Sequence, residues 1–266
     1  KQLRGSHDSY LGKKAIYMVS AWAEANELAL GQRKVDEKSN EITAIPELLK
    51  LLSLEGCIVT IDAIGTQTKI AKAIIDAGAD YLLSVKDNQK TLHQEIAWLF
   101  EYDQKNDFKN AAYDHAKTTD KGHGRIEIRE CWSISDPEYI QSLKGATKWK
   151  SLKSIAMVRS TRITNKKTTT KIRHYISSLP SKAEHLLKVA RRHWSIENEL
   201  HWVLDVALKE DKYRVRKGHA AENLALLRHI AMNLLKQEKT AKGGVRAKQL
   251  QAAWNNEYLL KVLRGQ

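Results

Sequence analysis

Cysteine, proline and glycine are scarce in this sequence, and long apolar runs are absent. The two cysteines among 266 residues, Cys57 and Cys131, are too few for a disulfide scaffold and too far apart for a zinc ribbon. No apolar run approaches the roughly 20 residues that a membrane-spanning helix requires. With 13 Gly, 3 Pro and 42% hydrophobic residues, the composition also excludes a disordered tail. The first ten residues lack the apolar stretch of a secretory signal, so we expect a cytoplasmic protein.

Positive charge is what the sequence has in excess. It holds 45 Lys and Arg against 31 Asp and Glu, which gives a formal net charge of +14. The isoelectric point is near 9.6, and the mean hydropathy is −0.51. An excess of this size favours a polyanionic partner, most simply nucleic acid, and therefore a location at the nucleoid.

Strands and helices alternate in the first hundred residues. Residues 15–34 contain two β-rich runs around a short polar connection, which predicts a hairpin. Apolar residues at helical spacing then alternate with short apolar runs typical of buried strands. The pattern predicts helices over 42–54, 67–77 and 88–100, and strands over 57–62 and 81–85. Such alternation predicts an α/β fold whose sheet has mixed strand directions.

The pattern changes twice in the rest of the chain. Residues 102–120 are polar without a clear period, and we interpret them as a loop or a frayed helix. Alternating runs between residues 124 and 178 predict the antiparallel strands of a β-rich insertion. From residue 181 onward the sequence predicts helices, over 181–208, 220–236 and, after a Gly243-Gly244 break, 247–263.

Asp62 is the first candidate functional residue. It follows the apolar run 57–61, and α/β sheets place functional groups at the carboxyl ends of their strands. A carboxylate held by a rigid strand suits metal-ion catalysis. The alternative is that Asp62 caps the following turn, which continues with Gly65 and Thr66.

A polar flank on the helix that follows the insertion is the second candidate. His193, Glu197, His201 and Asp205 recur every four residues, so their side chains share one flank. Beside them runs an apolar stripe that must face a core, formed by Ile196, Leu200, Val203 and Ala207.

Three interpretations of this flank remain open. It is a solvated face, or its imidazoles bind a transition metal, although the HExxH motif is absent. In the third interpretation Glu197 alone is an oxygen ligand for a hard cation such as Mg²⁺, and His193, Arg191 and Arg192 face phosphates.

Two basic segments are candidates for contacts with phosphates. Lys212, Arg214, Arg216 and Lys217 lie within six residues just after that helix. A solvated loop is the default explanation of such a run, but beside a carboxylate metal site it becomes a phosphate-binding surface. His123, in a His-Gly-Arg sequence before the predicted insertion, indicates by itself only a loop.

Four segments together carry a resemblance to a known family. They are TIDAIGTQTKIAKAIIDAGADYLLSVKDNQ, HGRIEIRECW, HWSIENELHWVLDVALKED and ENLALLRHIAMNLLK. The chain resembles the DDE transposases of bacterial insertion sequences, in particular the group that includes the H-repeat-associated proteins of Rhs elements. The resemblance runs over nearly the whole chain in the expected order. It implies an RNase H-like fold with a mixed five-stranded sheet, and DNA cleavage with two Mg²⁺ ions, for which Mn²⁺ is an alternative.

The resemblance implies roles for individual residues. Asp62 matches the second catalytic carboxylate of the family and Glu197 the third, so both are expected to bind Mg²⁺. The first aspartate of the family lies in a motif resembling Asp-Gly-Lys-x-x-Arg-Gly-Ser, whereas this chain starts with KQLRGS. We therefore expect that the Asp-Gly pair and the first strand, which would precede Lys1, are missing. Two of three metal ligands would then be present, and the chain as given would be inactive.

The resemblance also implies an organisation and a set of partners. The expected parts are a first portion of the catalytic domain (1–103), the β-rich insertion (104–180), the remainder of the catalytic domain (181–240) and a helical tail (241–266). We expect DNA cleavage and strand transfer by a homodimer that acts on transposon ends and target DNA. The residues expected to contact DNA are Lys1, Arg4, His123, Arg125, Arg191, Arg192, His193, Asn198, Lys212, Arg214, Arg216 and Lys217.

Two other functions stay open. The chain is a DNA-binding remnant of a mobile element without catalysis, or it is a zinc hydrolase that uses His193, His201 and Asp205. An in-frame Asp-Gly pair upstream of Lys1 distinguishes the transposase from the remnant, and tightly bound Zn²⁺ would indicate the hydrolase.

Overall fold

The computed structural model describes residues 1–10, 12–35, 40–109 and 112–265. Contacts group the chain into two compact units. The terminal unit comprises residues 1–52 and 194–266, and the central unit comprises residues 53–193. These limits differ from those of the four parts expected from the sequence, whose boundaries stay predictions.

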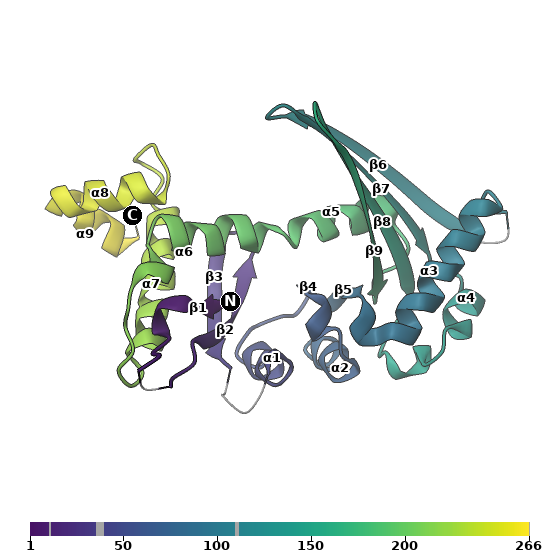
Figure 1. The fold of residues 1–266 in the computed structure, drawn as a ribbon, viewed down its shortest axis with the longest axis horizontal. Helices are drawn as coiled ribbons and strands as arrows, with labels where there is room; N and C mark the ends of the chain where they lie inside the picture. Colours follow the sequence, from purple (N-terminus) through teal and green to yellow (C-terminus); the bar gives the residue numbers. More distant parts are fainter. Residues whose placement is uncertain (11, 36–39, 110–111, 266) are drawn as a thin grey trace. The chain divides into compact units, whose positions relative to one another are not determined.

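A six-stranded sheet forms the central unit (Figure 1). Its strand order is β4-β5-β9-β8-β7-β6, and β4 and β5 are parallel whereas all other neighbours are antiparallel. The β-rich insertion thus continues the same sheet, because its last strand, β9, pairs with β5. The strands are β4 (Ile58–Ile61), β5 (Asp80–Val85), β6 (Tyr113–Gly122), β7 (Arg125–Ile134), β8 (Ser154–Thr164) and β9 (Thr168–Ser177).

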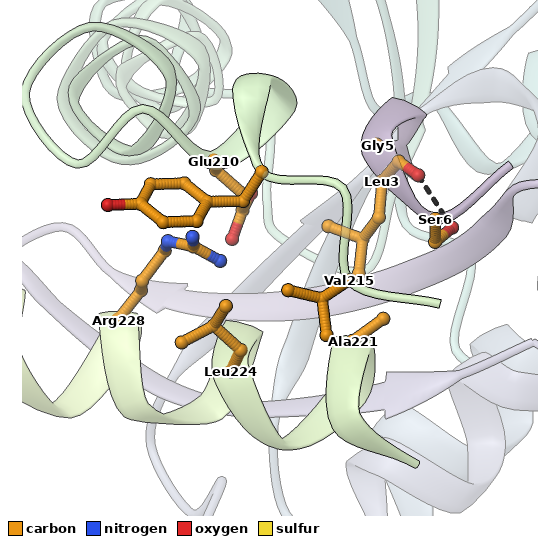
Figure 2. A pocket seen from close by; sticks show the side chains of 9 residues that line it. Leu3, Gly5, Ser6, Glu210, Val215, Ala221, Leu224 and Arg228 are labelled. Atoms are coloured by element: carbon orange, nitrogen blue, oxygen red, sulfur yellow. Dashed lines mark hydrogen bonds between the residues drawn. The ribbon is translucent and has the colours of Figure 1, made fainter. Parts of the chain in front are cut away.

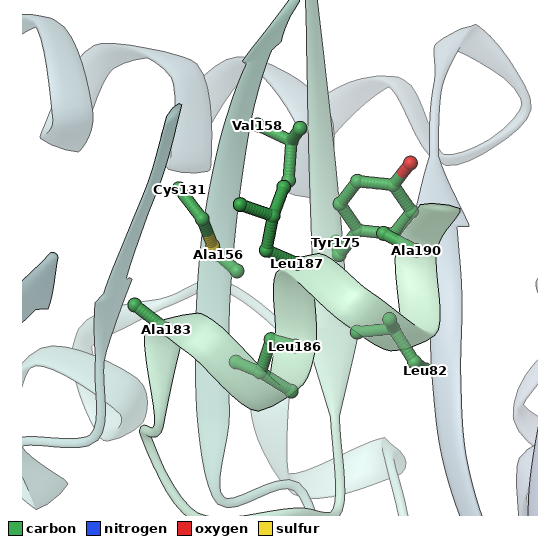
Figure 3. Close-up of a cluster of buried hydrophobic side chains, with 9 residues drawn as sticks. All are labelled: Leu82, Cys131, Ala156, Val158, Tyr175, Ala183, Leu186, Leu187 and Ala190. Atoms are coloured by element: carbon green, nitrogen blue, oxygen red, sulfur yellow. The ribbon is translucent and has the colours of Figure 1, made fainter. Parts of the chain in front are cut away.

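Helix α5 (Ala183–Arg192) covers one face of this sheet. Its apolar residues recur at helical spacing, so they form one stripe toward the strands. In Figure 3 that stripe meets side chains from β5, β7, β8 and β9. The cluster consists of Ala183, Leu186, Leu187 and Ala190 of the helix with Leu82, Cys131, Ala156, Val158 and Tyr175 of the sheet. The other helices of this unit are α2 (Thr68–Asp76), α3 (Lys90–Lys105) and α4 (Pro137–Ser142).

The interpretation of residues 102–120 as a loop or frayed helix was wrong. Helix α3 continues to Lys105, and strand β6 starts at Tyr113. Strand β6 lies at the edge of the sheet, and none of its residues is buried. Both faces of β6 are largely in water, so its sequence does not alternate between apolar and polar residues. That alternation is the pattern from which a strand is predicted.

The terminal unit contains a three-stranded antiparallel sheet and most of the helices. The predicted hairpin is confirmed as β2 (Ile16–Ala23) and β3 (Leu28–Lys34), and the short β1 (Gln2–Leu3) pairs with β2. The helices are α1 (Glu41–Leu49), the π-helix η5 (Ile196–His201), α6 (Trp202–Val206), α7 (Ala220–Gln237), α8 (Val245–Trp254) and α9 (Asn256–Arg264).

The tail beyond α7 has two helices instead of the single one predicted over 247–263. Asn255 interrupts the pattern, because its backbone is extended and its side chain accepts a hydrogen bond from Tyr258 N at 3.0 Å, which starts α9. Glu238, fully buried after α7, accepts hydrogen bonds from Tyr258 Oη at 2.8 Å and from Thr240 N at 2.6 Å. These bonds join α9 to the end of α7.

The predicted fold class is confirmed: the chain is α/β, with a mixed sheet, flanking helices and a β-rich insertion. The strand count differs from the five-stranded sheet that the resemblance implied, since the described residues form one sheet of six strands and one of three. Within the residues described, every helix is too short or too polar to span a bilayer.

Gly5 provides a test of the packing in the terminal unit. It lies in the 3-10 turn Arg4–Ser6, and a Cβ atom there would stand 1.9 Å from the backbone oxygen of Tyr213. We expect Gly5→Ala to destabilise the protein by about 2 kcal/mol, because a backbone atom cannot move aside cheaply. The measurement is Tm, which should fall by several degrees. Gly122→Ala is the control, because nothing lies within 4 Å of its added Cβ; equal effects of the two substitutions would contradict this packing.

Candidate active site

Asp62 lies at the carboxyl end of β4, directly before the short 3-10 turn η2 (Ala63–Gly65). The backbone closes this turn, since Gly65 N donates to the Asp62 carbonyl at 2.8 Å. The carboxylate instead has Oδ1 at 3.2 Å from Nε2 of His193. Its side chain is 67% exposed, so the carboxylate is open to solvent while one oxygen is held. This arrangement differs from the capping alternative raised by the sequence.

His193 connects the end of α5 to the end of β4. Its Nδ1 lies 3.0 Å from Oγ1 of Thr60, and its Nε2 faces Asp62. Because an ionised carboxylate only accepts, Nε2 carries the proton and the Thr60 hydroxyl donates to Nδ1. The imidazole is only 16% exposed. The imidazole therefore bridges Thr60, which lies in β4, and Asp62, which directly follows β4. It fixes the direction of the Asp62 side chain.

The loop after Asp62 is held by hydrogen bonds to β5 and to the loop that follows β5. Thr66, fully buried, donates from Oγ1 to the Ser84 carbonyl at 2.6 Å. Gln89 donates to the Thr66 carbonyl at 2.9 Å, and Asn88 donates to the Ala63 carbonyl. Sequence reasoning missed these supporting residues, although the polar Lys-Asp-Asn-Gln run directly after the apolar strand was a signal for them.

Glu197 lies in the π-helix η5 of the terminal unit. Its side chain is 53% exposed, and Oε1 lies 3.2 Å from Nδ1 of His201. Glu197 and His201, four positions apart, thus contact each other on the flank that the sequence predicted. Burial lowers the pKa of His201 although the negative charge of Glu197 acts to raise it. Short π-helical segments are rare, and they occur often at functional sites.

The π-helix changes which residues of this segment are buried. Leu200 and Ala207 of the predicted stripe are buried, but the other two predicted members are only half-buried. Each π turn holds an extra residue, so the buried face shifts along the sequence. The buried apolar residues are Leu200, Leu204, Ala207 and Leu208. Three of them, Leu200, Leu204 and Leu208, pack with Ala29 and Met232, and the partly buried Ile196 and Val203 pack against this cluster.

The polar flank divides among different partners. His193 contacts Thr60 and Asp62, His201 contacts Glu197, and Asp205 pairs with Lys1. The described residues contain no group of three or more His, Cys, Asp or Glu side chains that could hold a metal ion. Both observations count against a zinc site built from His193, His201 and Asp205.

Lys1 has internal partners. Its Nζ lies 2.5 Å from Asp205 Oδ1 and 2.8 Å from Glu210 Oε2, and its side chain is 10% exposed. Glu210 also lines a small pocket with Arg228 and Leu3 (Figure 2). The structure therefore favours an internal ion pair for Lys1 over the expected DNA contact. Arg4, by contrast, is 78% exposed and lies 3.5 Å from Asp211.

Most of the other residues expected to contact DNA reach solvent. His123 and Gly124 form the two-residue turn between β6 and β7, and both have the positive φ that a type I′ turn requires. Arg125 and Arg191 are exposed and pair with acidic neighbours, whereas Arg216 is half-buried at 3.6 Å from Asp8. The remaining exposed members of the set are Arg192, Asn198, Lys212, Arg214 and Lys217.

Comparison with known proteins identifies the family. Residues 4–234 match the family model of the transposase DDE domain. The chain belongs to the DDE transposase family. It is 40% identical over 269 residues to the H repeat-associated protein YhhI of Escherichia coli strain K12, covering 100% of this chain and 70% of that one. It is 43% identical over 267 residues to YncI of E. coli O157:H7, covering 99% and 67%. Both relatives are named as candidate transposases.

Family membership confirms the resemblance stated from the sequence. The DDE transposase domain is RNase H-like, its members act on DNA, and they generally use a divalent metal ion. A further relative, YbfL of E. coli strain K12, is 40% identical over the full length of this chain and is named only as a protein. The chain spans about 70% of the length of YbfL and YhhI.

His229 makes the stability of the terminal unit sensitive to acid. It is buried on α7, and burial, with smaller contributions from His201 and Lys1, lowers its pKa from 6.5 to about 4. The unfolded chain therefore binds this proton more tightly than the folded protein does. His229 contributes to stability above pH 6.5, and that contribution is lost as the pH falls from 6.5 towards 4.

We expect His229→Gln to flatten this pH dependence. Between pH 6.5 and 4 the free energy of unfolding of the parent protein should fall by up to about 1.4 kcal/mol more per pH unit than that of the variant. The measurement is urea unfolding at a series of pH values. His219→Gln, at a side chain that is 83% exposed, is the control and should follow the parent. Parallel curves for parent and His229→Gln would contradict the prediction.

Proposed function

We propose that this protein catalyses Mg²⁺-dependent DNA strand cleavage and strand transfer of an insertion sequence, with Asp62 and Glu197 as metal ligands. The observation that carries the proposal is the solvent-open Asp62 carboxylate, at the carboxyl end of a strand, in a chain of the DDE transposase family. Mn²⁺ is an alternative ion.

The chemistry of the two carboxylates fits a hard divalent cation. Both side chains are more than half exposed, and an imidazole lies beside each of them. Mg²⁺ prefers oxygen ligands, keeps several waters and is commonly bound through one or two carboxylates plus substrate phosphates. Asp62 and Glu197 would therefore bind Mg²⁺ together with oxygen atoms from DNA and water.

Individual residues of the chain would have different roles in the reaction. When bound, Mg²⁺ would lower the pKa of an attacking water and stabilise the leaving 3′ oxygen of the phosphodiester. His193 holds Oδ1 of Asp62 and so limits the rotation of that carboxylate. The phosphates would be held by Arg4, His123, Arg125, Arg191, Arg192, Asn198, Lys212, Arg214, Arg216 and Lys217.

Neutralising either carboxylate tests the proposed catalysis. We expect Asp62→Asn and Glu197→Gln each to reduce Mg²⁺-dependent nicking of transposon-end DNA by roughly a thousandfold or more, because each removes a charge that binds the ion. The assay uses the protein with the Asp-Gly pair that the family motif predicts before Lys1, with Mg²⁺ and with chelator.

Exposed carboxylates elsewhere serve as controls for this experiment. Glu101→Gln in the central unit and Glu47→Gln in the terminal unit remove the same charge from side chains that are 68% and 49% exposed. Both controls should nick DNA at the parent rate. Full activity of either Asp62→Asn or Glu197→Gln would reject its assignment, and DNA binding without any nicking would indicate a non-catalytic remnant.

Substitution of His193 distinguishes a role in positioning the Asp62 carboxylate from a direct contact with DNA. We expect His193→Ala to raise the Mg²⁺ concentration for half-maximal nicking by about tenfold or more, because partners of ligating carboxylates contribute 10–100-fold to metal affinity. Its DNA affinity should be unchanged, and His193→Gln, whose amide can donate to Asp62, should recover part of the loss. Mn²⁺ binding followed by paramagnetic resonance gives a readout that is independent of activity. A loss of DNA affinity with an unchanged Mg²⁺ requirement would make His193 a phosphate contact instead.

A further inference from the structure

The outer halves of β6, β7, β8 and β9 form an arm without a core. We define the distal arm as residues 117–130 and 159–173, all of which the structure describes. None of these residues is buried, whereas the inner halves of β7, β8 and β9 are largely buried. The distal arm is therefore a single layer with both faces in water, and in Figure 1 its two hairpins extend past α5.

Positive charge is concentrated on this arm. Its 29 residues carry ten Lys and Arg against three Asp and Glu, a net charge of +7 that is half of the +14 of the whole chain. Charges on exposed strands commonly prevent edge-to-edge aggregation, and lysine on an edge strand suffices for that. Four of the arginines lie instead on β7 and β8, which have a neighbouring strand on each side: Arg125, Arg129, Arg159 and Arg162. Protection of a sheet edge therefore does not explain these four arginines.

Strand register sorts these cations onto two faces. Arg129 is opposite Ser160, which is opposite Lys171, and Arg162 is opposite Glu127. Because side chains alternate along a strand, these residues share the face of Cys131 and Val158, which α5 covers nearer the core. Five cations of the arm lie on this face: Arg125, Arg129, Arg162, Lys171 and Arg173. The opposite face carries Lys117, Lys121 and Arg159 among four isoleucines, Ile126, Ile128, Ile163 and Ile172.

Two carboxylates organise the arginines on the face that α5 covers. Glu127 lies 2.9 Å from Arg125 Nε and 2.9 Å from Arg162 Nη2, and it also pairs with Arg129. Shared between three guanidinium groups, this carboxylate orients them without neutralising them. Burial acts to raise the pKa of Glu127, but the arginines outweigh it and lower the pKa, so the carboxylate stays charged. Guanidinium groups held in this way match the geometry of phosphate oxygens.

The second carboxylate, Asp120, joins the arm to α5. Asp120 accepts from Arg129 Nη1 at 2.7 Å and lies 3.1 Å from Arg191 Nη1. Arg191 lies in the last turn of α5, two residues before His193, which contacts Asp62. The cationic face thus continues from the arm, along the end of α5, toward the candidate metal ligand of the same unit.

We propose that this face of the distal arm binds the phosphate backbone of the duplex DNA that leads to Asp62. The inference rests on the proposed function, because DNA is the substrate there. The distal arm contains no Phe, Tyr or Trp, so it lacks the stacking platforms that bind unpaired bases. Arginine, lysine and threonine side chains suit contacts with phosphate, which set position and carry no sequence information.

Two double variants on opposite faces of the arm test the proposal. Arg162→Ala/Lys171→Ala removes two cations from the proposed face, and Lys117→Ala/Lys121→Ala removes two from the other. With a duplex of random sequence, the first variant should lose at least tenfold in affinity. Its log–log salt slope should shrink by roughly 1.8, at about 0.9 per phosphate contact. The second variant should bind like the parent. Tm and circular dichroism confirm that both variants fold.

The outcomes separate this inference from the function it rests on. Equal affinities and slopes for the two double variants would overturn the assignment of the face, while nicking by the parent would leave the proposed function intact. A single strand of the same length that competes as well as the duplex would overturn the choice of duplex DNA. A parent protein that binds no DNA at all would reject both proposals.

Discussion

The contact between Asp62 and His193 depends on the packing of α5 against the six-stranded sheet. Residues 183, 186, 187 and 190 form the apolar stripe that lays this helix on the strands. The helix then ends where its His193 meets Thr60 and Asp62 at the exit of β4. A change that shifted α5 would therefore move the imidazole away from the carboxylate, so the geometry at Asp62 is a consequence of hydrophobic packing along the helix that precedes His193.

Acidic residues have different roles in the central unit and in the terminal unit. Two of the three acidic residues of the arm, Asp120 and Glu127, lie among arginines, where they hold the guanidinium groups in place and leave a positive surplus. The acidic residues near Lys1 act differently, because Asp205 and Glu210 surround one nearly buried ammonium group. The same residue types thus serve an exposed surface in one unit and internal cohesion in the other, and burial decides which.

The sequence predicted the helices and strands whose apolar residues recur regularly. It missed the contacts between side chains that lie far apart in the chain. The hairpin over 15–34, helix α7 and strand β5 were predicted because buried faces impose regular spacing, and β4 because its residues are mostly apolar, although none of them is fully buried. Strand β6 has no buried residue and gave no signal. Two members of the predicted stripe, Leu200 and Ala207, are buried and the other two pack partly exposed against the same cluster, but no spacing rule predicts the π-helical turn. Asp62 and Glu197 were singled out from their positions and from the family resemblance, but His193 and Thr60 are 133 residues apart, so their contact could not be inferred from sequence alone.

The central claim is that Asp62 and Glu197 bind the divalent ion that cuts DNA. The most direct measurement is the anomalous scattering of Mn²⁺ in crystals of the protein with transposon-end DNA. The account predicts bound Mn²⁺ at about 2.1 Å from a carboxylate oxygen of each residue, close to the distance typical of Mg²⁺. Mn²⁺ bound elsewhere, with neither carboxylate among its ligands, would contradict it.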